Sequence, residues 1–445
     1  MNKRDFIKSA AALSTFVLLP SGLWSCKKEV KKLTRLRTAH IGVGNMGAED
    51  LKAISSHSKV DVTVLCDVDA NNLAAAKELH PNAKTYTDYR VMLKEMGDEI
   101  DAVVVSTPDH THAPASMMAM EMDKPVYCQK PLTHHISEAR EMQVVAKEKN
   151  LVTQMGIQVH SFYDYKLATK LIQSGIIGKV SSVRAWSPKN WGYDGPKPEG
   201  KDSIPANLDW NLWLGTAQKK NYKNEVYHPG NWRKLVDFGC GTLGDMGVHI
   251  FDTPYNALSL DVPKTIKNEC RPPNGFGFPE KNKVTYIFPG TEYTAEELKW
   301  IWYDGVDAPE SHIDLKLPNN ETLHDQGAMF IGEKGKLYLP HFMKEPQLII
   351  DNKYQEINFD KFDLEDPIRD YELESKKHYH QFVDACLGKA KCSAPFSYAS
   401  RLTETILLGV IAGRFPGETL NWDKDSAKFK EEKANQYISG QYRNF

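Results

Sequence analysis

The first third of the chain alternates short apolar runs with segments that favour helix. The apolar runs lie at residues 39–43, 60–66, 100–106, 125–128 and 152–155. Segments between them, such as 70–79 and 137–149, consist mainly of good helix formers. The run IDAVVVS at 100–106 is continuous and β-branched, which is typical of a strand buried on both faces of a parallel sheet. The pattern therefore predicts an α/β domain with a doubly wound parallel sheet, whose ligands lie at the carboxyl ends of its strands.

The pattern changes after Gly156. Strand-like runs now follow one another without helices between them, at residues 283–288, 297–303, 312–317, 328–331, 336–339 and 347–350. This succession predicts an α+β domain with an open, mostly antiparallel sheet. Helices at 376–387 and 398–412 are expected to close it. Residues 187–218 form a long loop rich in tryptophan, proline and glycine, and such loops carry binding function more often than scaffold.

A glycine pattern follows the first apolar run and precedes the first helix-like segment. The first glycine allows a tight turn, the second lets the backbone approach a pyrophosphate, and the third lets the helix lie close on the strand. Asp67 ends the second apolar run, twenty residues after the third glycine. A carboxylate there accepts bonds from ribose hydroxyls and repels a 2′-phosphate, so NAD is favoured over NADP. The alternative is an ordinary glycine-rich turn. The residues expected to contact the dinucleotide here are Gly42, Gly44, Asn45, Met46, Gly47 and Asp67.

Composition limits the partners. A chain of 445 residues is too long for one average core, so two domains are expected. The 56 basic residues are balanced by 58 acidic residues. Because nucleic-acid binders carry an excess of positive charge, this balance argues against a nucleic-acid partner and favours a small molecule.

Residues 1–26 have the build of an export signal, with a basic start, an apolar stretch at 10–19 and small residues after it. The pair Lys3-Arg4 resembles a twin-arginine signal, which would export a folded protein already loaded with its cofactor. Leu23-Trp24-Ser25-Cys26 resembles a lipobox, so Cys26 is expected to carry a lipid anchor. The alternative is plain cleavage to a soluble periplasmic protein. Of the other cysteines, Cys386 and Cys392 would allow a disulfide in an oxidising compartment, although buried thiols are the default expectation.

Two further stretches carry candidate chemistry. Lys130 follows a buried apolar run, so it is expected at the carboxyl end of a strand, where it could exchange a hydroxyl proton beside the nicotinamide. Asp245, His249 and Asp252 are spaced i, i+4 and i+7, which places them on one face of a helix. Histidine is the usual base near neutral pH, and a carboxylate one turn away can orient it. The alternatives are a surface lysine and a buried structural histidine. No cysteine pair or HExxH motif accompanies them, so no metal is expected.

Together these stretches resemble the Gfo/Idh/MocA oxidoreductase family. The resemblance covers about residues 36–412, through the motifs GVGNMG, CDVD, STPDHTH, PVYCQKPL, GKVSSV, NWRKLVDFGCGTLGDMGVHIFD and GAMFIGEKGKLYL. It implies a Rossmann domain followed by an open-sheet substrate domain, and hydride transfer on sugars or polyols. It also implies that the catalytic residues are Lys130, Asp245 and His249.

The resemblance implies further cofactor and substrate contacts. The segment that contacts the nicotinamide falls on Thr107, Pro108 and His112, next to Gln129 and Lys130. Gln129 stands where the family usually has glutamate, so its amide can hydrogen-bond but the charge is lost. The aromatic loop suits stacking on a sugar ring, or else forms core beneath the loop. The expected substrate-binding residues are His160, which stands where many members carry arginine, and Trp191, Trp232, Arg233, Asp245 and His249.

The expected organisation is an export signal at 1–26, a tether at 27–36, an NAD-binding Rossmann domain at 37–157, a substrate-binding domain at 158–423 and a tail at 424–445. The expected function is NAD-dependent hydride transfer on a sugar, glycoside or polyol. Because the periplasm offers no obvious NAD pool, the cofactor is expected to stay bound and be recycled.

Two other functions stay open at this point. One is an NAD-dependent glycoside hydrolase that works by transient oxidation, elimination and re-reduction. The other is a non-catalytic lipoprotein that binds a cofactor or sugar. In each case a homo-oligomer is expected to form through the open sheet.

Overall fold

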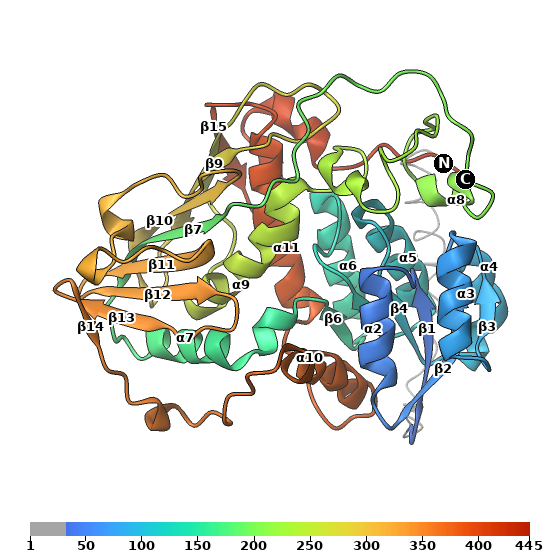
Figure 1. Cartoon of the computed structure of the whole chain (residues 1–445), viewed down its shortest axis with the longest axis horizontal. Coiled ribbons are helices and arrows are strands. Elements are labelled where there is room, and N and C mark those ends of the chain that lie inside the picture. Colours follow the sequence, from blue (N-terminus) through green and yellow to red (C-terminus); the bar gives the residue numbers. More distant parts are fainter. Residues whose placement is uncertain (1–32) are drawn as a thin grey trace, which may run out of the picture.

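The structure is a computed structural model that describes residues 33–445. The predicted export signal with Cys26, and most of the predicted tether, lie outside the described residues. The described chain forms two lobes side by side (Figure 1). The N-terminal lobe is built on a six-stranded sheet and the second lobe on a ten-stranded sheet. Within residues 33–445, no helix has the length and apolar character needed to cross a membrane.

The N-terminal sheet is entirely parallel, in the order β3-β2-β1-β4-β5-β6. Its strands are β1 (Leu36–Ile41), β2 (Val60–Cys66), β3 (Lys84–Tyr86), β4 (Ala102–Val105), β5 (Val126–Cys128) and β6 (Thr153–Met155). The strand order reverses between β1 and β4, and doubly wound sheets bind ligands at such a switch point. The predicted fold of this domain is therefore confirmed.

Helices cover both faces of this sheet. They are α2 (Met46–Ser55), α3 (Ala70–Leu79), α4 (Tyr89–Met96), α5 (Asp109–Glu121) and α6 (Ile136–Glu148). Aspartates cap two of them, because Asp69 accepts a bond from Asn71 N at 2.9 Å and Asp88 accepts one from Arg90 N at 2.8 Å. All four residues of β4 are buried, which explains its uninterrupted apolar sequence.

The second sheet has the order β14-β13-β12-β11-β7-β10-β9-β8-β15-β16. Its strands are β7 (Val180–Ser187), β8 (Thr265–Glu269), β9 (Asn282–Pro289), β10 (Thr294–Asp304), β11 (Gln326–Gly332), β12 (Lys336–His341), β13 (Gln347–Ile350), β14 (Lys353–Gln355), β15 (Thr419–Asp423) and β16 (Lys428–Phe429). In the described chain β7 pairs with β10 in parallel, and the other pairs of this sheet are antiparallel. The predicted open, mostly antiparallel sheet is confirmed.

The two faces of the second sheet are covered differently. Helices α7 (Tyr163–Gln173), α9 (Val248–Ala257) and α11 (Phe396–Ala412) join one core with alternate residues of the central strands, including Trp300 and Trp302. The other face carries Ile301 and Tyr303, and Leu315 packs against it. The alternation follows from the two-residue period of a strand.

The prediction of a strand at residues 312–317 is wrong. This segment contains a short 3-10 helix at Ile313–Leu315 instead. His312 Nδ1 accepts a bond from Asp314 N at 3.1 Å, and Arg184 Nε donates to Asp314 Oδ2 at 2.9 Å. These bonds hold the chain in a turn against the sheet. An alternating polar and apolar sequence cannot reveal such a partner, which lies 130 residues away.

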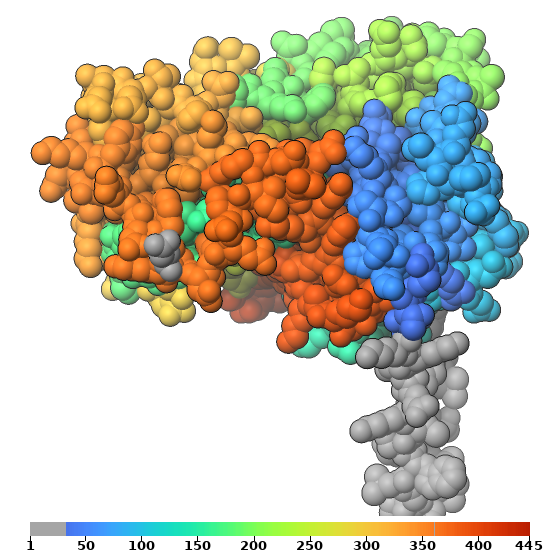
Figure 2. All heavy atoms as spheres, turned by 60° about the horizontal axis from the view of Figure 1, so that its bottom comes forward, coloured from blue at the N-terminus to red at the C-terminus, as the bar shows by residue number. Residues whose placement is uncertain are grey.

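The lobes are joined by the chain around α10 (Tyr371–Cys386), which packs against α2. In the space-filling view this orange segment fills the space between the lobes (Figure 2). Cys386 and Cys392 are both free thiols, so the Cys386–Cys392 disulfide does not form. The default expectation of buried thiols holds for Cys66, Cys128 and Cys240, whereas Cys386 and Cys392 are only partly buried.

Candidate active site

The glycine turn lies between β1 and α2 and leaves no room for a side chain at its first and third glycines. Gly42 has a φ of +81°, and a Cβ there would lie 2.7 Å from Ser106 O. A Cβ on Gly47 would lie 2.2 Å from Gly42 O. The first position therefore needs the left-handed conformation and the third needs close packing of helix on strand. This is the cradle that a dinucleotide pyrophosphate requires.

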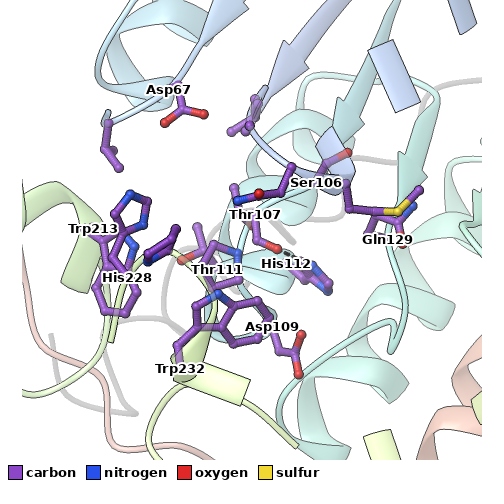
Figure 3. Close-up of a pocket in the computed structure, with 18 of the residues that line it drawn as sticks. Asp67, Ser106, Thr107, Asp109, Thr111, His112, Gln129, Trp213, His228 and Trp232 are labelled. Atoms are coloured by element: carbon purple, nitrogen blue, oxygen red, sulfur yellow. Dashed lines mark hydrogen bonds between the residues drawn. The ribbon is translucent and has the colours of Figure 1, made fainter. Parts of the chain in front are cut away.

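Asp67 stands at the carboxyl end of β2 and faces the same cavity (Figure 3). Its Oδ2 accepts a bond from Val43 N and its Oδ1 accepts one from Asp69 N, both at 2.8 Å. Burial raises the pKa of Asp67, and these backbone bonds oppose the rise. The bonds hold the carboxyl group at the edge of the glycine turn, where it can meet a ribose.

The turn after β4 carries Thr107 and Pro108, which line the cavity. His112, one turn into α5, lies with its two ring nitrogens 2.8 Å from Thr107 O and Pro131 O. Because one side chain spans both carbonyl groups, His112 ties the turn after β4 to the turn after β5. His112 therefore holds these two turns in position beside the expected nicotinamide site.

Gln129 belongs to a buried polar network behind the cavity. Its Nε2 donates to both oxygens of Asp50, at 2.8 and 2.9 Å, and Tyr379 Oη donates to Asp50 Oδ1 at 2.8 Å. Burial raises the pKa of Asp50 to about 6, against these bonds. Gln129 itself carries no carboxyl group, but Asp50 on α2 places one in direct contact with its side chain.

Lys130 and Asp245 form the central pair of the site. Lys130 Nζ donates to Asp245 Oδ1 at 2.7 Å, and Trp191 Nε1 donates to Asp245 Oδ2 at 2.6 Å. Burial acts to raise the pKa of Asp245, but the charges of Lys130 and Arg233 hold it well below its usual range. Asp245 is therefore ionised, and it fixes the lysine at the carboxyl end of β5.

The helix that carries Asp245 and His249 is not regular. Residues Leu243–Gly247 form a π-turn, and α9 begins only at Val248. Asp245 therefore lies in a turn that departs from the regular helical spacing assumed for the prediction. Within residues 33–445, no hydrogen bond joins His249 to Asp245 or Lys130, and His249 Nδ1 is buried without a partner. In the described chain the structure therefore shows no bond through which Asp245 would orient His249, and that role stays a prediction.

His249 does not line the main cavity, but it lies near enough to Lys130 and Asp245 for their charges to act on its pKa. Burial lowers the pKa of His249 well below its ordinary value, and the charge of Lys130 adds to this effect. The imidazole is therefore neutral at neutral pH. A neutral histidine can accept a proton, so its predicted role as a base stays a prediction.

His160 is placed elsewhere. Its Nδ1 lies 2.9 Å from Asp252 Oδ1, and its ring packs on Tyr398. Tyr398 Oη also donates to Asp252 Oδ1 at 2.7 Å. His160 and Asp252 thus form a structural pair inside the second lobe and do not line the main cavity. The structure does not support a substrate contact at His160.

The aromatic loop forms a lid over the cavity. We define the lid as residues 188–242, which run over the Rossmann domain from the second lobe and include α8 (Trp210–Leu214) (Figure 1). Trp191, Trp213 and Trp232 line a cavity of about 380 Å³, and Trp210, Trp213 and Trp232 belong to the lid's own core. Both interpretations of the tryptophans therefore apply, and Trp213 and Trp232 fit both.

The lid is bonded to the ribose end of the site. His228 Nε2 lies 2.9 Å from Asp69 Oδ2, and Asn207 Nδ2 donates to Asp69 Oδ1 at 2.7 Å. A β-bridge joins Asp69 to Leu208. The turn that follows Asp67 therefore holds the lid directly, and a cofactor in the cavity is covered on its outer side.

Several cavity residues were missed from the sequence. Burial raises the pKa of Asp109 to about 7, although Arg233 and Lys130 oppose the rise. Asp109 lies beside Trp232 at the end of the cavity opposite Asp67 (Figure 3). Its position at the first residue of α5, directly after the turn that follows a buried strand, is a usable signal in the sequence. Lys189, His228 and Phe445 also line the cavity, and their distance from the motifs left no signal.

The residues present fit NAD. The glycine turn has no room for a Cβ, Asp67 faces the adjoining space, and Lys130 lies at the other end of the same cavity. Within residues 33–445, no cluster of three or more histidines, cysteines or acidic residues is arranged to hold a metal ion.

Comparisons with known proteins agree with this geometry. Residues 36–157 match a family described as "Oxidoreductase family, NAD-binding Rossmann fold", and residues 162–275 match "Oxidoreductase family, C-terminal alpha/beta domain". The chain is 23% identical to 2,7-anhydro-N-acetylneuraminate hydratase of Escherichia coli, over 68% of this chain and 73% of that protein. It is 30% identical to inositol 2-dehydrogenase of Corynebacterium glutamicum, over 34% of this chain and 44% of that protein.

Solved structures share the fold. An oxidoreductase domain protein from Kribbella flavida superposes with a TM-score of 0.63 at 20% identity, over 87% of this chain and 99% of that one. A levoglucosan dehydrogenase in complex with NADH and L-sorbose superposes with a TM-score of 0.62 at 16% identity, over 87% and 99% of the two chains.

The parallel sheet with its glycine turn, followed by the open-sheet domain with its Lys130–Asp245 pair, defines an NAD-binding oxidoreductase. The chain belongs to the Gfo/Idh/MocA oxidoreductase family.

Proposed function

We propose that this oxidoreductase moves a hydride between a sugar or polyol carbon and an NAD that stays bound between turnovers. The observation that carries the proposal is the Lys130–Asp245 ion pair, which faces the same cavity as the glycine turn. Relatives named for inositol and levoglucosan support the substrate class. Their names describe those proteins, and the cavity of this chain is the reason to extend the class to it.

The proton chemistry rests on Lys130. Bound NAD supplies the hydride acceptor or donor. During oxidation the substrate hydroxyl gives its proton to the neutral amine form of Lys130, and the ammonium group that results returns the proton during reduction. Asp245 holds the ammonium group in position through its Oδ1 at 2.7 Å. The neutral imidazole of His249 is the second candidate acceptor for the same proton.

The lid supports the retained cofactor. It crosses the outer side of the cavity, and the bonds from His228 and Asn207 to Asp69 attach it beside the expected ribose site. For NAD to leave, these bonds must break together with the packing of Trp213 against His110. A cofactor that is slow to leave must be oxidised and reduced within each cycle.

The test is to purify the protein, pass it through gel filtration and measure the nicotinamide that remains. We expect about one NAD per chain, and repeated turnover of the true sugar with none added. Activity that is lost on desalting and restored only by stoichiometric NAD would contradict the retained cofactor. Absence of any change in nicotinamide absorbance across a broad panel of sugars, glycosides and polyols would support the non-catalytic alternative.

A second candidate function is elimination or hydrolysis through a transient ketone. The similarity to a hydratase favours it, and so does Asp109. A ketone makes the neighbouring C–H acidic, so a base removes that proton and the C–O bond of the leaving group breaks. The departing oxygen then needs a proton. Asp109, at the same end of the cavity as Lys130 and with its pKa raised to about 7, is suited to donate it.

We also propose that the protein is exported to the periplasm and anchored there by a lipid on Cys26. The support is the sequence of residues 1–26 alone. Replacing both Lys3 and Arg4 by alanine should leave the protein in the cytoplasm, as measured by fractionation. Unchanged export would indicate the general secretory route.

A homo-oligomer through the open sheet remains a proposal too. Residues around Leu315 cover part of the outer face of β10 and β11, so a second copy would contact the remaining strands. Sedimentation of the purified protein tests this directly, and a single species at the mass of one chain would contradict it.

A further inference from the structure

The cavity has two chemically different ends. The glycine turn and Asp67 lie at the end expected for adenosine and pyrophosphate. Lys130, Lys189 and Arg233 gather at the other end around Asp245. This second end is where a substrate must meet the nicotinamide, because Lys130 lies there.

The cations at the substrate end are not matched by carboxylates. Asp245 Oδ1 lies 2.7 Å from Lys130 Nζ but 3.8 Å from Arg233 Nε, and its Oδ2 lies 3.9 Å from Lys189 Nζ. Asp245 is therefore committed to Lys130. Asp109 also faces this end, but burial raises its pKa to about 7, so it is only partly ionised at neutral pH and offsets only part of the positive charge.

Arg233 has hydrogen-bonding capacity that the protein does not use. Within residues 33–445, no acceptor forms a hydrogen bond with its guanidinium group, although the side chain is only 28% exposed. The guanidinium carbon lies 4.3 Å from the centre of the Trp232 ring, and such stacking holds the planar group in one orientation. A fixed guanidinium plane with free N–H groups suits an anion bound through two oxygens.

Trp191 extends this positive surface. Lys189, Arg233 and Lys234 each carry their charge within 6 Å of its ring, at 5.5, 5.8 and 5.9 Å. The pyrophosphate of the cofactor does not explain these charges, because its cradle is the glycine turn at the opposite end. An oxidised nicotinamide is itself a cation, so bound NAD leaves the surplus positive charge in place.

We propose that the substrate is an anionic sugar, whose carboxylate or sulfate group binds the free N–H groups of Arg233 while Lys189 attracts it and Trp191 packs on the ring. This inference rests on the proposed function, since it assumes that the cavity takes a carbohydrate. It adds the charge of that carbohydrate, which neither the family nor the fold specifies.

The test compares matched sugars that differ only in charge, by calorimetry with the purified, NAD-loaded protein. Suitable pairs are methyl glucuronide against methyl glucoside and methyl galacturonide against methyl galactoside, with glucose 6-sulfate to separate sulfate from carboxylate. We expect at least one anionic sugar to bind about tenfold or more tightly than its neutral partner, with the difference shrinking as salt rises. Equal or tighter binding of the neutral sugars, or no binding in any pair, overturns the proposal.

Three variants locate the effect. Arg233→Gln should abolish the preference for the anion while leaving NAD bound. Arg233→Lys should keep only part of the preference, because lysine lacks the planar guanidinium group that binds two oxygens at once. Lys264→Gln is the matched control, because it removes the same charge from an exposed pair with Glu297. A preference that survives in Arg233→Gln also overturns the proposal.

The result is independent of the redox chemistry. Calorimetry measures the binding of the sugar, whereas nicotinamide absorbance measures the proposed hydride transfer. Anionic sugars that bind through Arg233 without changing that absorbance would uphold the charge preference and refute the oxidoreductase activity on them.

Discussion

The cofactor end and the substrate end of the cavity are built in different ways. At the cofactor end, the glycine turn and Asp67 come from one short stretch of chain, and the backbone bonds that Asp67 accepts come from residues no more than 24 positions away. At the substrate end, Lys130 meets Asp245, which lies 115 residues away, and Trp191 comes from the lid. One end is therefore a local motif, whereas the other depends on the assembly of two lobes.

This difference separates binding from chemistry. Changes at the cofactor end should alter which dinucleotide binds and how tightly. Changes at the substrate end should alter turnover while the dinucleotide stays bound. The lid touches both ends, so a change there should affect retention and turnover together.

The largest effect is expected at Lys130. Lys130→Ala removes the group that exchanges the hydroxyl proton, so turnover should fall by roughly 10²–10⁴-fold while NAD still copurifies. Asp245→Ala should have a similar effect, and the double variant should be little worse than either, because the two act as a unit. Steady-state rates and the nicotinamide content of each variant check this. Small additive losses would mean that the pair is only structural.

The next effect tests whether Asp109 is an acid. If its protonated form donates to a leaving group, the rate should be highest below pH 7. It should then fall about tenfold per pH unit above the pKa of about 7, because the proton is lost there. The pH profile of turnover measures this fall in rate. Asp109→Asn should slow the reaction and remove the fall in rate above pH 7. A net oxidoreduction with no leaving group gives a profile that Asp109→Asn leaves unchanged.

A smaller effect is expected at the lid. His228→Ala removes the bond to Asp69 at 2.9 Å, so NAD should leave about tenfold faster, as for the loss of one charge-assisted hydrogen bond. Release can be followed by adding a scavenging enzyme that consumes free NAD. His57→Ala is the control, since His57 pairs with Asp384 away from the cavity. Equal release from both variants would show that the lid does not retain the cofactor.

The smallest effect concerns the choice of dinucleotide. Asp67→Ala removes the carboxyl group expected to bind the ribose and repel a 2′-phosphate, so the preference for NAD over NADP should narrow by about tenfold or less. Protein stripped of cofactor and titrated with each dinucleotide gives the two affinities. Equal affinities in the unmutated protein would contradict the role of Asp67.

By itself, the sequence determined the alternation of strands and helices, the glycine turn and the position of Lys130 after β5. These follow from hydrophobic period and from steric limits at single residues, such as Gly47, where a Cβ would lie 2.2 Å from a carbonyl oxygen. Such features depend on residues close together in the chain, so they can be predicted from the amino-acid sequence.

Only the tertiary structure decided the rest of the site. Asp245 bonds to Lys130, 115 residues away, and His160 pairs with Asp252, 92 residues away and outside the cavity lining. The lid brings Arg233 to the substrate end. Packing and charge between distant segments select these partners, and no local pattern in the sequence contains them.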